Sequence, residues 1–439
     1  MARTLQNQWF ALLLAGILIL PGCKLSAYHN EPLGSPVQTR ASFNVTDTQG
    51  NDDVLVALAI SGGGSRAAYF AACAMFKLQK VIEGVDLMKE VDVISSVSGG
   101  SLPAAYYCIS MDELGFTARS GRLWEEATVK ELMSRNFQGR WLGNNFWPGN
   151  FCRSMFTAYD HSDIMAQTLE DNLFDTKGMG LPLTFYDLNP ERPYLILNAT
   201  DVTADNGEEK HFGNVFTFTD EDFVSKLNSD LSTFPIAWGV MASCAFPGVF
   251  NLMTLKDFRD DSVERYMHVF DGGNSDNLGL ESIKKIILHS MFWGDAPAHK
   301  HYIVILIDSY QNGQGVDPAD YDPRSFMSTI FDTNVIDAFD SLLKFRRDDL
   351  INQFSTGILD VDKDKKIAVK DLTFWHLTFE DIDPTLPDQN NESLYKTVNH
   401  IPTNFHIIGE DRERIDRAVD HLIQKNNPKL IEIFQKLYR

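Results

Sequence analysis

The fold is indicated by residues 54–68, which read VLVALAISGGGSRAA. The first seven are all apolar, so they predict a strand that is buried on both faces, as in a parallel sheet. Three glycines at 62–64 end this strand, and the alanine-rich stretch at 67–77 predicts a helix directly after them. A buried strand, a glycine turn and a helix in this order are typical of an α/β protein.

Short apolar runs elsewhere in the chain repeat this pattern. They predict strands at 54–60, 91–96, 194–200, 268–270 and 302–307. Near the end, five apolar residues share one face of a 3.6-residue period and predict a closing helix that packs on the sheet: Ile415, Ala418, Val419, Leu422 and Ile423. We therefore expect three layers, a central, mostly parallel sheet with helices on both faces, in one unit over residues 54–439 with insertions and C-terminal helices.

The composition excludes several classes of protein. Of 439 residues, 44% are apolar and 11% aromatic, which provides enough apolar surface for a large core and excludes disordered and collagen-like chains. Asp and Glu outnumber Lys and Arg by 60 to 39, a net charge of −21. This excess repels a polyanion and no basic patch interrupts it, so nucleic acid is not an expected partner.

The first 22 residues read as an export signal. Arg3 is their one charge, and the apolar run at 9–20 is shorter than the roughly 20 residues that span a bilayer. The ending Leu-Pro-Gly-Cys at 20–23 resembles the signal of bacterial lipoproteins, which implies acylation of Cys23 as a lipid anchor. The alternative is an ordinary secretory signal with an incidental cysteine.

The polar residues 23–53 have no apolar period and predict a flexible tether between the anchor and the folded unit. An exported, membrane-attached lipoprotein is the expected location. Lys24 follows the cysteine, where some bacteria use Asp to retain lipoproteins at the inner membrane, so the outer membrane is favoured. The other cysteines form no CxxC pair and are expected to be buried in the core: Cys73, Cys108, Cys152 and Cys244.

The glycine stretch Gly62, Gly63 and Gly64 precedes a predicted helix. Successive N–H groups at a helix N-terminus bind a phosphate or a developing oxyanion. A dinucleotide site is disfavoured, because Ala67 stands where GxGxxG has its last glycine. A plain tight turn is the alternative.

Residues 93–101, VISSVSGGS, predict a strand that ends at a sharp, small-residue turn. Such a turn presents a serine hydroxyl at the strand end, and only small neighbours two residues away avoid its strained backbone. Ser98 has Gly100 on one side and Ser96 on the other, which departs from GxSxG. We predict Ser98 as the nucleophile, with Ser95, Ser96 and Ser101 as rival hydroxyls and a simple strand-to-helix turn as the alternative.

Asp271 follows the predicted strand at 268–270 and precedes two glycines. A carboxylate at the carboxyl end of a strand lies where α/β enzymes assemble their sites. An Asp–Gly turn is the alternative.

No histidine stands in a recognisable constellation with Ser98. His268 is the nearest candidate for a triad, although a histidine facing the core or solvent is favoured.

In this order, a glycine loop, an exposed serine and a carboxylate are the parts of a serine acyl hydrolase. The chain resembles the patatin-like phospholipases by its GGGxR loop, the Ser98 turn, the Asp-Gly-Gly at 271–273 and the block ASCAFP at 242–247. The resemblance implies a patatin-like fold and a Ser98–Asp271 dyad without catalytic histidine, metal or cofactor. It also implies an oxyanion hole drawn from the loop and the turn: Gly62, Gly63, Gly64, Arg66 and Gly99. Arg66 supplies positive charge there or braces the structure.

The expected substrates are phospholipids, lysophospholipids or other acyl esters, and the expected contact with a membrane surface is through the anchor. Acyl transfer to an acceptor other than water is the close alternative on the same dyad. A catalytically silent, membrane-tethered binding protein is the alternative from another class.

Two further segments leave alternatives open. Bulky residues at 141–156 suit a lid or acyl-chain rim, although ordinary core is favoured: Trp141, Phe146, Trp147, Phe151 and Phe156. Asp360, Asp362, Asp364 and Asp371 have the spacing of a calcium loop, but Lys365 stands where that loop needs glycine. A solvated hairpin between Ile358 and a strand at 372–379 is therefore favoured over calcium binding.

Overall fold

The computed structural model describes residues 28–34, 53–82, 84–113, 119–204, 211–260, 262–292, 300–311, 333–362, 365–425 and 427–437. The predicted signal peptide, Cys23 and most of the predicted tether lie outside the described residues. No helix among these described ranges has the length and apolar character needed to cross a bilayer.

The core is an eight-stranded, mostly parallel sheet. Its order is β12 (Leu372–Thr378), β9 (His301–Asp308), β2 (Val54–Ile60), β3 (Val93–Val97), β4 (Tyr194–Asp201), β8 (Arg265–Asp271) and β7 (Met253–Asp257), with β5 (Val215–Phe218) also paired to β4. The strands from β12 to β4 are parallel, and β8, β7 and β5 are antiparallel to their neighbours. The predicted fold class is confirmed. The five predicted strands are present, β2 with the predicted bounds and the other four with shifted ends.

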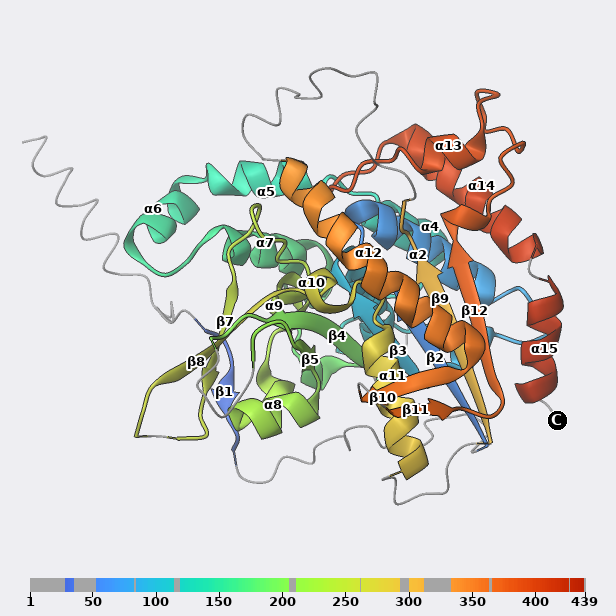
Figure 1. Cartoon of the computed structure of the whole chain (residues 1–439). Coiled ribbons are helices and arrows are strands. Elements are labelled where there is room, and N and C mark those ends of the chain that lie inside the picture. The colour runs from blue at the N-terminus through green and yellow to red at the C-terminus, as the bar shows by residue number, and fades with distance from the viewer. Residues whose placement is uncertain are drawn as a thin grey trace, which may run out of the picture.

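Alternate residues of β2 enter two separate cores, because successive side chains of a strand point to opposite faces. Val56 and Leu58 pack in one cluster, while Leu55 and Ala57 pack in the other. The first cluster is covered by α2 (Gly64–Leu78), α3 (Ser101–Ile109), α7 (His161–Leu169), α9 (Ile236–Ser243) and α14 (Gly409–Lys425). The second is covered by α11 (Leu280–Phe292) and α12 (Thr333–Thr356), which cross the near face of the sheet in Figure 1.

Smaller elements surround these layers. They are α4 (Glu126–Met133), α5 (Phe137–Asn145), α6 (Pro148–Phe156), α8 (Asp220–Leu227), α10 (Gly273–Asp276), α13 (Leu394–Val398), α15 (Asn427–Leu437), β1 (Glu31–Pro32), β6 (Ser229–Asp230), β10 (Ile358–Asp362) and β11 (Lys365–Ala368).

Three predictions from the sequence can be compared with these elements. The apolar face predicted for the closing helix is buried in α14, which also contacts α2 through a Tyr69–Asp416 hydrogen bond. Antiparallel β10 and β11 form the predicted hairpin, where Lys366 pairs with Asp360 at 3.1 Å. The tether prediction is wrong for residues 28–34, because β1 pairs with β6 and Asn30 bonds Ser229.

Candidate active site

Ser98 lies at the turn between β3 and α3 in a backbone conformation that is rare for a residue with a side chain. Its φ is 49°, in the left-handed region. The turn is held by the Ser98 N–H, which donates to Ser243 Oγ at 2.9 Å. Ser98 keeps 9% of its surface exposed. Backbone strain held by surrounding bonds at a serine is the geometry of a nucleophile turn.

The other candidate hydroxyls, those of Ser95, Ser96 and Ser101, are fully buried and make hydrogen bonds that hold the turn in place. Ser95 Oγ donates to the carbonyl of Gly279 at 2.7 Å. Ser96 Oγ donates to Ser101 Oγ at 3.2 Å, and Ser101 in turn contacts Ser243. The side chain at position 96, which departs from the GxSxG pattern, therefore fits because its hydroxyl has a partner inside the turn.

Asp271 lies within hydrogen-bonding reach of Ser98, whose Oγ donates to Asp271 Oδ2 at 2.7 Å. The other carboxylate oxygen accepts from the Gly273 N–H at 2.8 Å. Burial raises the pKa of Asp271 to about 6, against the lowering effect of its bonds from Gly273 and Ser98. The ionised form of Asp271 is thus less stable than that of an exposed aspartate, but it still predominates at neutral pH.

The strand that carries Asp271 differs from the expectation. β8 runs antiparallel to β4, with Asp271 opposite Ala199, while Val97 of β3 is opposite the preceding residue, Asn198. β4 thus lies between the strands that carry Ser98 and Asp271, and the antiparallel register of β8 on β4 brings the two residues together. They do not meet at the shared carboxyl edge of parallel strands.

The block at 242–247 joins the two halves of this pair. Ser243 Oγ accepts from Ser98 N–H and donates to the carbonyl of Asn198 at 2.7 Å. The carbonyl of Ala245 accepts from the Asp271 N–H at 3.1 Å. The sequence places this block near Asp271 but gives no sign that Ser243 holds the Ser98 turn while Ala245 holds Asp271.

The glycine loop, residues 61–64, packs closely against the Ser98 turn. A Cβ on Gly99 would collide with the carbonyl of Gly64, and one on Gly62 would lie 3.2 Å from Ser98 Cβ. Gly63 and Gly64 also have φ values of 138° and 60°, which L side chains rarely adopt. Glycine is therefore required on both sides of this contact.

Two members of the predicted oxyanion hole have other partners. The Gly62 N–H donates to the carbonyl of Asn277 at 3.0 Å. The Arg66 guanidinium is buried and donates to the carbonyls of Ser309 and Ile401 at 3.1 and 2.7 Å. These bonds favour a bracing role for Arg66 and remove the Gly62 N–H from the candidate donors.

Ser309, which the sequence analysis missed, holds the glycine loop from the next strand. Its Oγ donates to the carbonyl of Gly62 at 2.7 Å, and its N–H donates to Ser61 Oγ at 2.8 Å. Ser309 follows β9, which is parallel to β2, so its position at the same carboxyl edge was the available signal.

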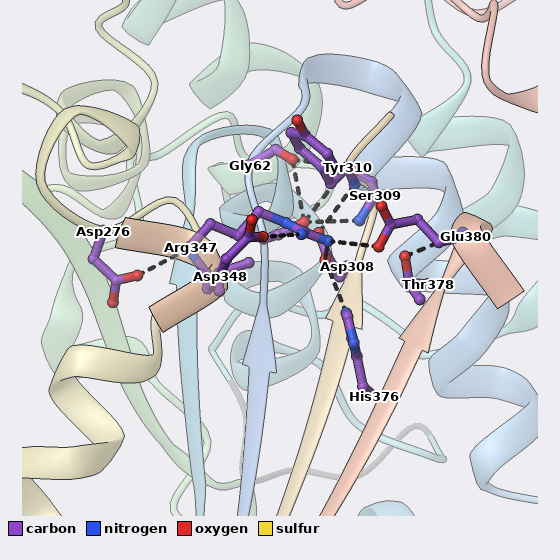
Figure 2. A network of polar contacts seen from close by, with 12 residues as sticks. Gly62, Asp276, Asp308, Ser309, Tyr310, Arg347, Asp348, His376, Thr378 and Glu380 are labelled. Atoms are coloured by element: carbon purple, nitrogen blue, oxygen red, sulfur yellow. Dashed lines mark hydrogen bonds and ion pairs between the residues drawn. The ribbon is translucent and has the colours of Figure 1, made fainter. Parts of the chain in front are cut away.

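A buried charged network lies behind Ser309 (Figure 2). Asp308 Oδ2 accepts from Arg347 at 2.6 Å and contacts His376 Nε2 at 2.9 Å. Burial opposes ionisation of Asp308, but the bond from His376 and the charge of Arg347 outweigh it and hold the pKa of this carboxyl well below its usual range. The network fixes the end of β9 and so supports the loop that Ser309 holds.

No histidine among the described residues bonds to Ser98 or Asp271. His268 Nδ1 instead contacts Thr254 Oγ1 at 3.1 Å, between β8 and β7. This position agrees with the expectation of a strand histidine outside the site.

The family model described as patatin-like phospholipase matches residues 58–283. Among solved structures, human GIVD cytosolic phospholipase A2 is 12% identical with a TM-score of 0.46, and covers 87% of this chain and 60% of its own. VipD from Legionella pneumophila is 14% identical with a TM-score of 0.30, and covers 84% of this chain and 67% of its own. The chain thus spans about 60% of the human enzyme's length, and no curated protein matches it. Since the matched family region takes in just over half of the residues, from β2 to α11, the chain belongs to the patatin-like phospholipase family.

Proposed function

We propose that the chain hydrolyses lipid esters with Ser98 as nucleophile and Asp271 as its base. The observation that carries the proposal is the 2.7 Å hydrogen bond from Ser98 Oγ to Asp271 Oδ2. A serine hydroxyl needs a base to become a nucleophile, and a carboxylate with a pKa of about 6 is both ionised at neutral pH and a better base than an exposed aspartate.

The reaction balances with these two residues. Ser98 Oγ bonds to the ester carbonyl carbon while its proton passes to Asp271, and the carbonyl oxygen becomes an oxyanion. Collapse of this intermediate expels the alkoxide, which takes the proton from Asp271. Water then attacks the acyl-serine, gives its proton to Asp271, and Ser98 recovers the proton as the fatty acid leaves.

We assign the oxyanion contacts to the N–H groups of Gly63, Gly64 and Gly99. The close contact of Gly99 with the Gly64 carbonyl supports this assignment, and the N-terminus of α2, which begins at Gly64, adds its positive dipole end. Arg66 and Ser309 act indirectly, because their hydrogen bonds hold the glycine loop in shape.

The assay measures hydrolysis of a short-chain nitrophenyl ester and of labelled phospholipid. Ser98→Ala and Asp271→Asn are each expected to lose activity by about 10⁴-fold or more, because both remove the nucleophilic step. His268→Ala is the control and is expected to keep the parent rate. Parent-level activity in the Ser98 or Asp271 variant refutes the dyad. Product analysis with an added alcohol acceptor separates hydrolysis from acyl transfer.

We further propose that residues 54–439 form one catalytic unit, because β9 and β12 complete the sheet that β2 begins and Ser309 supports the glycine loop.

Export and acylation at Cys23, with the outer membrane as destination, remain our proposal from the sequence. Mass spectrometry of the mature N-terminus tests it. A diacylglyceryl-modified Cys23 that is lost in Cys23→Ser is the expected result, and an unmodified terminus overturns it.

A further inference from the structure

Helix α6 and the turn before it expose large apolar side chains. The exposed fractions are 82% for Phe146, 67% for Trp147, 55% for Phe151, 63% for Met155 and 72% for Phe156. No residue of α6 is buried, and Cys152, which we expected in the core, is exposed as well. The expectation that these aromatic residues are ordinary core is wrong except for Trp141, which packs against Phe250.

The arrangement of these side chains is that of a helix lying on a surface. Phe151 and Met155 are four residues apart and share one face of α6, and Phe156 is exposed at its C-terminal end. A group of five exposed apolar side chains within 11 positions is far larger than the scattered apolar residues of an ordinary surface. It therefore requires a partner that covers it.

The local charge differs from that of the rest of the chain. No Asp or Glu occurs between Glu131 and Asp160, although 60 of the 439 residues are acidic. Arg140 and Arg153 lie in this segment, and Arg153 stacks over the Tyr159 ring. An apolar face without acidic residues suits a bilayer, including one with anionic lipids that would repel most of this protein.

Residues near the start of the described chain and residues just after α6 line one cavity. His29 packs against Trp238 in a tilted arrangement with ring centroids 4.8 Å apart, and a cavity of about 430 Å³ is lined by both His29 and Ala158, two residues after α6. In Figure 1, β1, which begins two residues after His29, and α6 lie on the same side of the molecule.

We propose that the exposed face of α6, together with Phe146 and Trp147, is the surface by which this enzyme docks on a phospholipid bilayer. The occupant is the lipid surface itself, which the substrate class of the proposed function supplies. The cavity lined by Ala158, two residues after α6, is also lined by Ala242 and Phe270, the residues immediately before Ser243 and Asp271.

Trp147 is the natural probe. Among the described residues, the other tryptophans are buried: Trp124, Trp141, Trp238 and Trp375. The chain from residue 23 onward, which lacks Trp9 and the apolar run of the predicted signal, carries Cys23→Ser to remove any acyl anchor. It is mixed with phosphatidylcholine vesicles whose acyl chains carry bromine, which quenches tryptophan on contact. Quenching that is lost in the same chain with Trp147→Phe is expected. Equal quenching in both, or none, overturns the proposal.

A second experiment separates docking from chemistry. Phe151→Ser combined with Phe156→Ser is expected to lower hydrolysis of vesicle phospholipid by about tenfold or more and to leave hydrolysis of a dissolved short-chain ester unchanged. Ile431→Ser is the matched control, since Ile431 is 55% exposed on α15, at the opposite end of the molecule in Figure 1. A control that falls equally, or equal loss on both substrates, contradicts the proposal.

These experiments also distinguish this proposal from the proposed function on which it rests. If neither substrate is hydrolysed by the parent, the dyad fails while the quenching result still decides the docking surface. Sedimentation of parent and double variant tests the competing occupant. A parent dimer that the double variant converts to a monomer assigns α6 to a contact between two copies and refutes the lipid surface.

Discussion

The glycine loop and helix α6 differ in which kinds of side chain are buried and which are exposed. Around the loop, Ser61, Arg66 and Ser309 are buried and each makes hydrogen bonds that cross from one element to another. Along α6, no side chain is buried and the apolar residues point outward. Polar groups placed inside and apolar groups placed outside both cost stability, which is the basis for our proposals of chemistry in the first region and contact with lipid in the second.

The largest expected effect is on the buried network behind the loop. Arg347→Ala leaves Asp308 without its cation in a fully buried site, and we expect it to lower the free energy of unfolding by about 3–5 kcal/mol in urea titrations. Arg346→Ala is the neighbouring control. Arg346 is 46% exposed and pairs with Glu281 at 3.6 Å, so its loss should cost about 1 kcal/mol or less. Equal costs for the two variants would contradict the role of the network.

The second prediction compares Gly99, which packs against the glycine loop, with Gly143 in α5, the helix before α6. Gly99→Ala pushes a methyl group against the carbonyl of Gly64, so we expect turnover of a nitrophenyl ester to fall about 100-fold or more through displacement of the oxyanion donors. Gly143→Ala in α5 meets no atom within 4 Å and is expected to keep full activity and to gain about 0.5–1 kcal/mol of stability. Full activity in the Gly99 variant would show that the contact of the two turns is dispensable.

The third prediction is the pH dependence of turnover. Asp271 must be ionised to accept the Ser98 proton, and its pKa is raised to about 6. We therefore expect kcat/KM to rise with pH through about 6 and to be about tenfold lower at pH 5 than at pH 7. A rise centred near pH 4, the usual value for aspartate, would contradict the burial of this carboxyl as the cause.

The same shift has the opposite sign for stability. A carboxyl whose pKa is raised in the folded state stabilises the fold below its unfolded pKa, and this contribution is lost as the pH rises through about 6. Asp271→Asn is therefore expected to unfold at equal or higher urea concentration than the parent at pH 8, although it is inactive. A marked loss of stability at pH 8 would count against this linkage.

The smallest expected effect is on the stability contributed by α6. Phe156 is 72% exposed, so Phe156→Ser should change the free energy of unfolding by about 0.5 kcal/mol or less. Phe137→Ala, at a fully buried position of the neighbouring α5, should cost about 3–5 kcal/mol. A large cost at Phe156 would mean that its side chain belongs to the core and would remove the contrast between the two regions.

Much of the fold was predictable because it depends on local patterns. The apolar run at 54–60 and the closing-helix face at 415–423 coincide with β2 and α14, since burial requires apolar residues at fixed periods. The exposure of α6 was not predictable in this way. Phe151 and Phe156 have the same side chains as core residues, and only the position of the helix on the molecule decides whether another element covers them.

The sequence by itself determined the residues that carry the proposed chemistry: the glycines at 62–64, Ser98 and Asp271 all stand at strand ends that local patterns reveal. The tertiary structure alone decided how they meet. Asp271 reaches Ser98 by the register of an antiparallel strand, and Ser243 and Ser309 join turns that lie 145 and 247 residues apart in the chain. Hydrogen bonds between distant segments depend on how strands pair, and no local propensity encodes that pairing.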